Sequence, residues 1–234
     1  MSVHRVRAGG VQLAVREAGA ANTPPMVLLH ALGERAASWA PVTERFAERF
    51  HVFAFDLRGH GDSDWPGEYS FRLMREDVHA ALAALDLGPV TVAGHSMGGT
   101  VALNLAMHDP TQVHRLVVED AAPPFRRERA VPERPSEPLD FDWAAVPAIV
   151  GEVNAGDHQA WQQLNTISAP TLIIGGGPTS SVPQDLLARA ARLIPRCTLV
   201  TIDAGHRVHA TRPGEFADAV LGWLERVPVD GAAD

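Results

Sequence analysis

Residues 90–102 read Val-Thr-Val-Ala-Gly94-His-Ser96-Met-Gly98-Gly-Thr-Val-Ala, a pattern typical of a strand that turns sharply into a helix. The turn has the form Gly-x-Ser-x-Gly, because so tight a bend leaves no space for side chains two positions before or after the serine. It lifts the Ser96 hydroxyl above the sheet and aims the first amide groups of the helix at the same point. We therefore expect Ser96 to be a catalytic nucleophile, with a purely structural turn as the alternative.

The same alternation of strand and helix continues along most of the chain. Continuous apolar stretches of strand length indicate strands buried on both faces; they span residues 26–29, 51–55, 90–93, 115–118, 171–174 and 198–202. Apolar residues three and four apart predict helices around residues 39–46, 71–85, 186–194 and 216–224. Two alternating stretches, 3–7 and 11–16, predict a hairpin before them. The fold class is therefore α/β, with a doubly wound, mostly parallel sheet.

Residues 123–169 interrupt this alternation. They are rich in proline, carry Arg126, Arg127 and Arg129, and include aromatic residues that could pack against the core. We predict that they form a small cap or lid over one end of the sheet, inserted into a core made of residues 1–122 and 170–234. A mobile surface loop is the alternative.

Composition excludes several classes of function. Hydrophobic residues make up 46% of the 234 residues and charged residues 21%, as in globular proteins, and the net charge of −8 argues against nucleic-acid binding. All 20 cationic residues are arginine, so lysine-dependent Schiff-base and P-loop chemistry are absent. Cys197 is the single cysteine, and no His-Glu-x-x-His spacing occurs, so we predict neither a metal site nor a cofactor.

The chain also lacks signs of membrane attachment or export. Its longest apolar runs are much shorter than the ~20 residues that span a bilayer. Residues 1–7 carry charges without the apolar stretch of a signal peptide. We expect a cytoplasmic protein that acts on a small-molecule substrate; its oligomeric state cannot be read from these features.

A serine nucleophile needs a base, and His206 is the preferred candidate among 11 histidines. It follows the predicted strand 198–202 and precedes the last helix, so its loop opens at the same sheet edge as Ser96. His209 lies three residues further along and is the weaker candidate. His95 adjoins the serine but is expected to point into the packed interior.

The third member of such a site is a carboxylate that orients the histidine. The loop after strand 171–174, where this architecture usually places it, contains no acidic residue between Gly175 and Pro183. Glu119 and Asp120 end the preceding strand at the same edge. We prefer Asp120 because it is last on the strand and nearest the rim, and Glu119 stays open as the alternative.

The oxyanion that forms during acyl transfer needs backbone donors. The main-chain N–H of Met97, directly after the serine, is one expected donor. The other is expected in the turn His30-Ala-Leu32-Gly-Glu34, where Leu32 is the better candidate.

Together these motifs resemble the α/β-hydrolase superfamily. The resemblance runs from the turn at His30 through Asp56-Leu-Arg-Gly-His-Gly-Asp-Ser63 and Gly-His-Ser96-Met-Gly-Gly to Gly205-His206. The order Ser96, Asp120, His206 matches that family's order of nucleophile, acid and histidine, and the position of Asp120 is similar to the esterase branch that carries its acid after the sixth strand. The chain departs from the family in having His30-Ala31 where His-Gly is usual.

The resemblance implies that the cap supplies a wall of the substrate pocket. The residues expected to line this pocket are His30, Phe125, Trp143 and Trp161. The neighbouring arginines at 126, 127 and 129 either attract a substrate carboxylate or form a solvated charge run.

The preferred function is a serine hydrolase that cleaves an ester or thioester of a small to medium carboxylic acid through an acyl-enzyme on Ser96. Lyases, C–C hydrolases and cofactor-free perhydrolases share the same fold and are the alternative within it. A ligand-binding protein without catalysis on this scaffold is the third possibility, favoured by the missing acid after strand 171–174.

Overall fold

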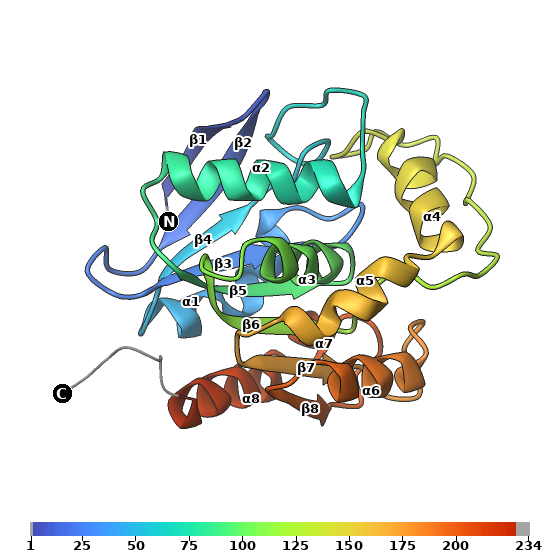
Figure 1. Cartoon of the computed structure of the whole chain (residues 1–234). Helices are drawn as coiled ribbons and strands as arrows, with labels where there is room; N and C mark the ends of the chain where they lie inside the picture. The colour runs from blue at the N-terminus through green and yellow to red at the C-terminus, as the bar shows by residue number, and fades with distance from the viewer. Residues whose placement is uncertain (1, 228–234) are drawn as a thin grey trace.

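The computed structural model describes residues 2–227 and contains a single mixed sheet with helices on both faces (Figure 1). The strands are β1 Ser2–Ala8, β2 Val11–Ala18, β3 Pro25–Leu29, β4 His51–Phe55, β5 Val90–His95, β6 Val113–Glu119, β7 Thr171–Gly175 and β8 Cys197–Thr201. They are arranged in the order β1-β2-β4-β3-β5-β6-β7-β8. The strands from β3 to β8 are parallel, whereas the β1–β2 hairpin pairs antiparallel with β4. The predicted α/β class and mostly parallel sheet are thus confirmed.

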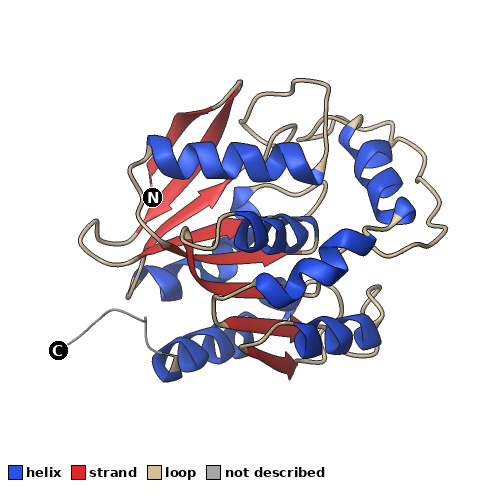
Figure 2. Cartoon of the chain, viewed as in Figure 1, coloured by secondary structure: helices blue, strands red, loops and turns tan. Residues whose placement is uncertain are grey.

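Helices cover the two faces of the sheet (Figure 2). The α-helices are α1 Ala40–Ala47, α2 Phe71–Ala84, α3 Met97–His108, α4 Ala145–Ala155, α5 His158–Gln163, α6 Gln184–Leu193, α7 Val208–Thr211 and α8 Pro213–Arg226, and two short 3₁₀ turns are η1 Ala36–Trp39 and η2 Leu164–Thr166. One apolar cluster joins the sheet to α2, α3 and α6, and a second joins the other face to α1 and α8.

The central strands contribute to both clusters because their side chains alternate between the faces. In β3, Val27 and Leu29 belong to the first cluster and Met26 and Leu28 to the second, all with no exposed surface. This explains the continuous apolar runs in the sequence.

Strand β8 differs from the expectation that every apolar run is buried on both faces. It forms the edge of the sheet and pairs with β7, and Thr198, Leu199 and Thr201 are exposed. A strand with a single neighbour has less surface to cover it, so an apolar run here reflects β-propensity as much as burial.

The segment between β6 and β7 contains α4, α5 and η2, which lie near the carboxyl ends of the parallel strands (Figure 1). Ile149, Trp161, Leu164 and Ile167 from this segment join the first apolar cluster of the sheet core. The segment therefore shares the main core and has no separate apolar cluster within the described residues.

Within residues 2–227, no helix combines the length and apolar character needed to cross a bilayer.

Candidate active site

Ser96 lies on the turn between β5 and α3 with a φ of +52°, a strained conformation for a residue with a side chain. The surrounding glycines allow this turn. A Cβ on Gly94 would collide with the main-chain oxygen of Gly98, and one on Gly98 would collide with that of Leu29. The Gly98 N–H also donates to the His30 carbonyl, 3.1 Å away, which ties the turn to the loop after β3.

Three side chains that are far apart in the sequence form a continuous hydrogen-bonded chain at this edge. The Ser96 Oγ lies 2.9 Å from His206 Nε2, and His206 Nδ1 lies 2.6 Å from Asp120 Oδ2. The carboxylate is buried, whereas 30% of the His206 side chain is exposed. The structure therefore brings together the serine, histidine and acid selected from the sequence.

Asp120 is held as an anion by a dense set of donors. Besides His206, its carboxylate accepts hydrogen bonds from Gly176 N–H at 2.9 Å, Gln184 Nε2 at 3.1 Å and the Ser180 hydroxyl. Burial alone would raise the pKa of Asp120, but these hydrogen bonds outweigh burial and lower it. An ionised carboxylate in this position can orient His206 and stabilise its imidazolium form.

Glu119, the alternative acid, faces a different histidine. Its carboxylate accepts from His209 Nδ1 at 2.8 and 2.9 Å and from the His209 main-chain N–H at 2.9 Å. Both side chains are fully buried, and the His209 ring stacks on Trp39 with centroids 4.3 Å apart. Glu119, the last residue of β6, and Asp120, the residue after it, thus hold two different histidines.

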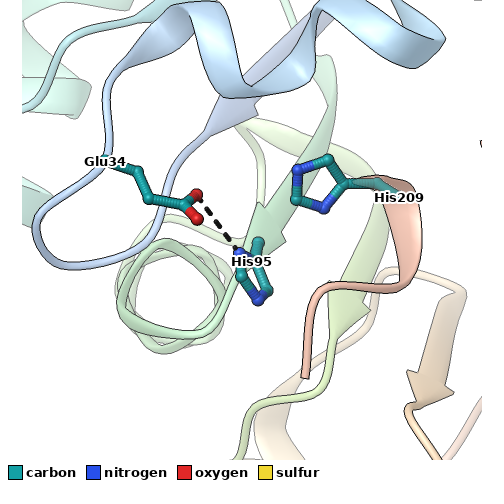
Figure 3. A group of neighbouring side chains, drawn as sticks. All are labelled: Glu34, His95 and His209. Atoms are coloured by element: carbon teal, nitrogen blue, oxygen red, sulfur yellow. Dashed lines mark ion pairs between the residues drawn. The ribbon is translucent and has the colours of Figure 1, made fainter. Parts of the chain in front are cut away.

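Glu34, His95 and His209 form a second cluster of neighbouring side chains (Figure 3). His95 Nε2 donates to the His206 main-chain oxygen at 2.7 Å, and its Nδ1 faces Glu34 Oε2 at 3.6 Å. Arg207 Nε lies 2.9 Å from the other Glu34 oxygen. Glu34 is the last residue of the turn proposed for oxyanion binding, so the cluster connects that turn, the serine turn and the histidine loop.

Glu34, His95 and His209 are also the group of described residues that could hold a metal ion, since one ligand atom from each lies within 4.8 Å of the others. Burial alone would lower the pKa of His95, but the negative charges of Glu119 and Glu34 outweigh it and raise that pKa. Burial would raise the pKa of Glu34, yet its interaction with His95 and the charge of Arg207 lower it to about 2. His95 and Glu34 thus form an ion pair, while Glu34 Oε2, His95 Nδ1 and His209 Nε2 are buried without a hydrogen-bond partner among the described residues.

A cavity of about 90 Å³ opens beside Ser96. Leu32 and Met97, the two expected oxyanion donors, line it together with Phe125 and apolar residues of α2, α4 and α6. Met97 is the first residue of α3, so its N–H has no acceptor within the helix. The Leu32 N–H has no main-chain acceptor among residues 2–227.

Three of the four residues expected to line the pocket lie elsewhere, so that prediction is corrected. His30 is fully buried, with Nδ1 bonded to the Ala31 oxygen and Nε2 accepting from Leu57 N–H, and burial lowers its pKa to about 3. Trp143 packs on Phe141, with ring centroids 6.2 Å apart. Trp161 is buried and donates its indole N–H to the Pro124 oxygen at 3.0 Å. Trp161 thus holds Pro124, which lines the cavity, and Phe125 alone of the four lines the cavity itself.

Several residues of this site were not selected from the sequence. Ser180 lies in the loop that lacks an acid and Gln184 begins α6 directly after it; both serve as donors to Asp120 rather than as its replacement. The hydroxyl-bearing residues of that loop were the sequence feature that could have indicated donors to the acid. The role of Glu34 could not be recognised from the sequence, because its partners His95 and Arg207 are distant from it along the chain.

Residues 24–147 match the model of the α/β hydrolase fold family. This match covers more than half of the chain.

The chain belongs to the α/β hydrolase fold family.

Similar proteins agree with this assignment. The sn-1-specific diacylglycerol lipase ABHD11 of Mus musculus is 28% identical over 253 residues, covering 88% of this chain and 82% of the lipase. A hydrolase from Pseudomonas aeruginosa superimposes with a TM-score of 0.83 at 26% identity, covering 95% of this chain and 98% of that one. An N-acyl homoserine lactone degrading enzyme superimposes with a TM-score of 0.81 at 26% identity, covering 94% of this chain and 100% of that one. This α/β hydrolase is therefore an enzyme, and the three similar proteins named above are a lipase, a hydrolase and a lactone-degrading enzyme.

Proposed function

We propose that this α/β hydrolase cleaves carboxylic esters or thioesters of small to medium acids through an acyl-enzyme on Ser96. The observation that carries the proposal is the chain of hydrogen bonds from Ser96 through His206 to Asp120. The names of two relatives, a lipase and a lactone-degrading enzyme, indicate cleavage of ester bonds in those proteins and support the same reaction class here.

The residues suggest the following steps. His206 Nε2 accepts the Ser96 proton as Oγ attacks the substrate carbonyl carbon, and Asp120 stabilises the imidazolium that forms. The main-chain N–H groups of Leu32 and Met97 stabilise the tetrahedral oxyanion. His206 then gives the proton to the leaving alcohol or thiol, which departs as the acyl-enzyme forms. A water molecule, deprotonated by His206, attacks the acyl-enzyme and releases the acid, restoring Ser96.

Hydrolysis of p-nitrophenyl acetate and butyrate tests this proposal. We expect Ser96→Ala to lose about 10⁶-fold in kcat, as triad serines do, with an unchanged circular dichroism spectrum. Ser136→Ala is the matched control, because Ser136 is exposed and contacts Glu137. If Ser96→Ala kept more than about a hundredth of the wild-type rate, Ser96 would not be the nucleophile.

A further inference from the structure

One wall of the cavity beside Ser96 is formed by the segment after β6, and this wall carries two arginines. Arg127 and Arg129 line the cavity together with Phe125 and Pro124. The remaining walls are largely apolar, with side chains such as Ile149 and Leu186. The positive charges therefore border a small apolar space that also contains the proposed nucleophile.

The arginine-bearing segment is anchored to the helices beneath it. Asn154, near the end of α4, exchanges two hydrogen bonds with the Arg129 main chain, at 2.9 and 2.8 Å, and its carbonyl accepts from Arg127 N–H at 3.3 Å. The Pro124 carbonyl accepts from Trp161 Nε1 at 3.0 Å and from Asp157 N–H at 2.9 Å. Because the backbone is held at both ends, the arginines project from a built surface rather than from a free loop.

Neither guanidinium has a carboxylate partner within residues 2–227, although the chain has more acidic than basic residues. The Arg127 Nε is buried without a hydrogen-bond acceptor, and its guanidinium lies over the Phe125 ring, 5.0 Å from the centroid. The acidic residue that lines the cavity is Asp120, whose oxygens are already engaged by His206 and three other donors.

Arg129 also disfavours the positive charge of Arg127. Burial lowers the pKa of Arg127, and the nearby positive charge of Arg129 lowers it further. A buried donor without an acceptor is costly, and an anion placed between the guanidiniums would both accept hydrogen bonds and relieve the repulsion.

We propose that Arg127 and Arg129 form an anion subsite that selects acyl groups ending in a carboxylate, so that the preferred substrates are monoesters of short dicarboxylic acids. This inference rests on the proposed ester hydrolysis at Ser96. The small apolar cavity accommodates a short methylene chain, with the ester at Ser96 and the free carboxylate at the arginine wall. Guanidinium groups recognise carboxylates through paired, charge-assisted hydrogen bonds.

Monoethyl glutarate and ethyl pentanoate provide a matched test, because their five-carbon acyl chains differ in the terminal carboxylate. We expect wild-type kcat/KM, measured by proton release at constant pH, to favour the glutarate monoester. Arg127→Gln combined with Arg129→Gln should reduce kcat/KM for the glutarate monoester by roughly tenfold to a hundredfold, the range of hydrogen bonds to charged groups. The pentanoate rate should change less than about twofold, since its chain makes no such bond. Arg126→Gln is the control, as Arg126 is exposed on the same segment and does not line the cavity.

Binding to the Ser96→Ala variant separates this inference from the proposed reaction. Calorimetry should show that monoethyl glutarate binds to Ser96→Ala. Its affinity should fall by roughly tenfold or more when both arginines are also replaced. Arginine-dependent binding without wild-type turnover would overturn the ester hydrolysis and leave the subsite in place. Hydrolysis of both esters at equal rates, or an equal loss on both in the double variant, would overturn the anion subsite while leaving the reaction intact.

Discussion

His95 Nε2 donates a hydrogen bond to the main-chain oxygen of His206, 2.7 Å away. The residue beside the proposed nucleophile thus holds the backbone of the proposed base. Glu34 extends this contact, since it faces His95 Nδ1 and pairs with Arg207, the residue after His206. The three loops that carry Ser96, His206 and the proposed oxyanion donor are therefore connected behind the site.

This connection predicts a pH-dependent contribution of His95 to stability. Glu119 and Glu34 raise the pKa of His95 in the folded state, so the folded protein binds the His95 proton more tightly than the unfolded protein does. The stabilisation is fully present below the unfolded pKa of ~6.5 and is lost as the pH rises through the folded pKa. We expect the loss in unfolding free energy of His95→Gln, measured in urea, to be larger at about pH 6 than at about pH 9.

Glu34→Gln provides the check on this cause. In that background one of the charges that raise the His95 pKa is gone, so the pH dependence of the His95→Gln effect should shrink. A His95→Gln effect that is the same at both pH values, or that grows at high pH, would contradict a protonated His95.

The two neighbouring acids at the end of β6, Glu119 and Asp120, should respond differently to loss of charge. Asp120→Asn removes the anion that orients His206, and we expect kcat on p-nitrophenyl butyrate to fall by about 10⁴-fold with little change in KM. Glu119→Gln alters the buried contacts of His209 instead, so it should cost about 1–3 kcal/mol of unfolding free energy and less than about tenfold in kcat. Kinetics and urea unfolding of both variants measure these effects. A large loss of kcat in Glu119→Gln instead of Asp120→Asn would identify Glu119 as the acid.

The tight serine turn predicts a strong effect at Gly98. A methyl group there would meet the main-chain oxygens of Leu29 and His30, which are fixed in β3 and the following loop. We expect Gly98→Ala to lose about 4 kcal/mol or more of unfolding free energy, or to fail to fold. Gly151→Ala is the control: nothing lies near that position on α4, so alanine should be neutral or stabilise by up to about 1 kcal/mol. Equal stability of the two variants in thermal unfolding would be inconsistent with this packing.

The sheet could be predicted from the sequence because its signal is local. Apolar runs such as 26–29 and 90–93 reflect burial on two faces, and the Gly-x-Ser-x-Gly turn must follow a strand and precede a helix. The strand at β8 was predictable, but its exposure was not, because an apolar run cannot reveal that its strand lies at the sheet edge.

The site was less predictable where it depends on the paths of long loops. Ser96, Asp120 and His206 follow strands, and the topology brings strand ends to a common edge. Trp143 and Trp161 lie in the irregular segment between β6 and β7, so their aromatic character could not show whether they line the cavity or pack elsewhere. The contact between Ser180 and Asp120 likewise depends on a loop path that no local pattern encodes.

Labelling with a fluorophosphonate, followed by intact-mass measurement and peptide mapping, tests the central claim most directly. Attack by an activated serine expels fluoride and leaves a stable phosphonyl adduct on the nucleophile. The account predicts one adduct per wild-type chain, located on Ser96, present in Ser136→Ala and absent in Ser96→Ala. An adduct on another residue, an adduct that persists in Ser96→Ala, or an unlabelled wild-type protein would contradict Ser96 as the activated nucleophile.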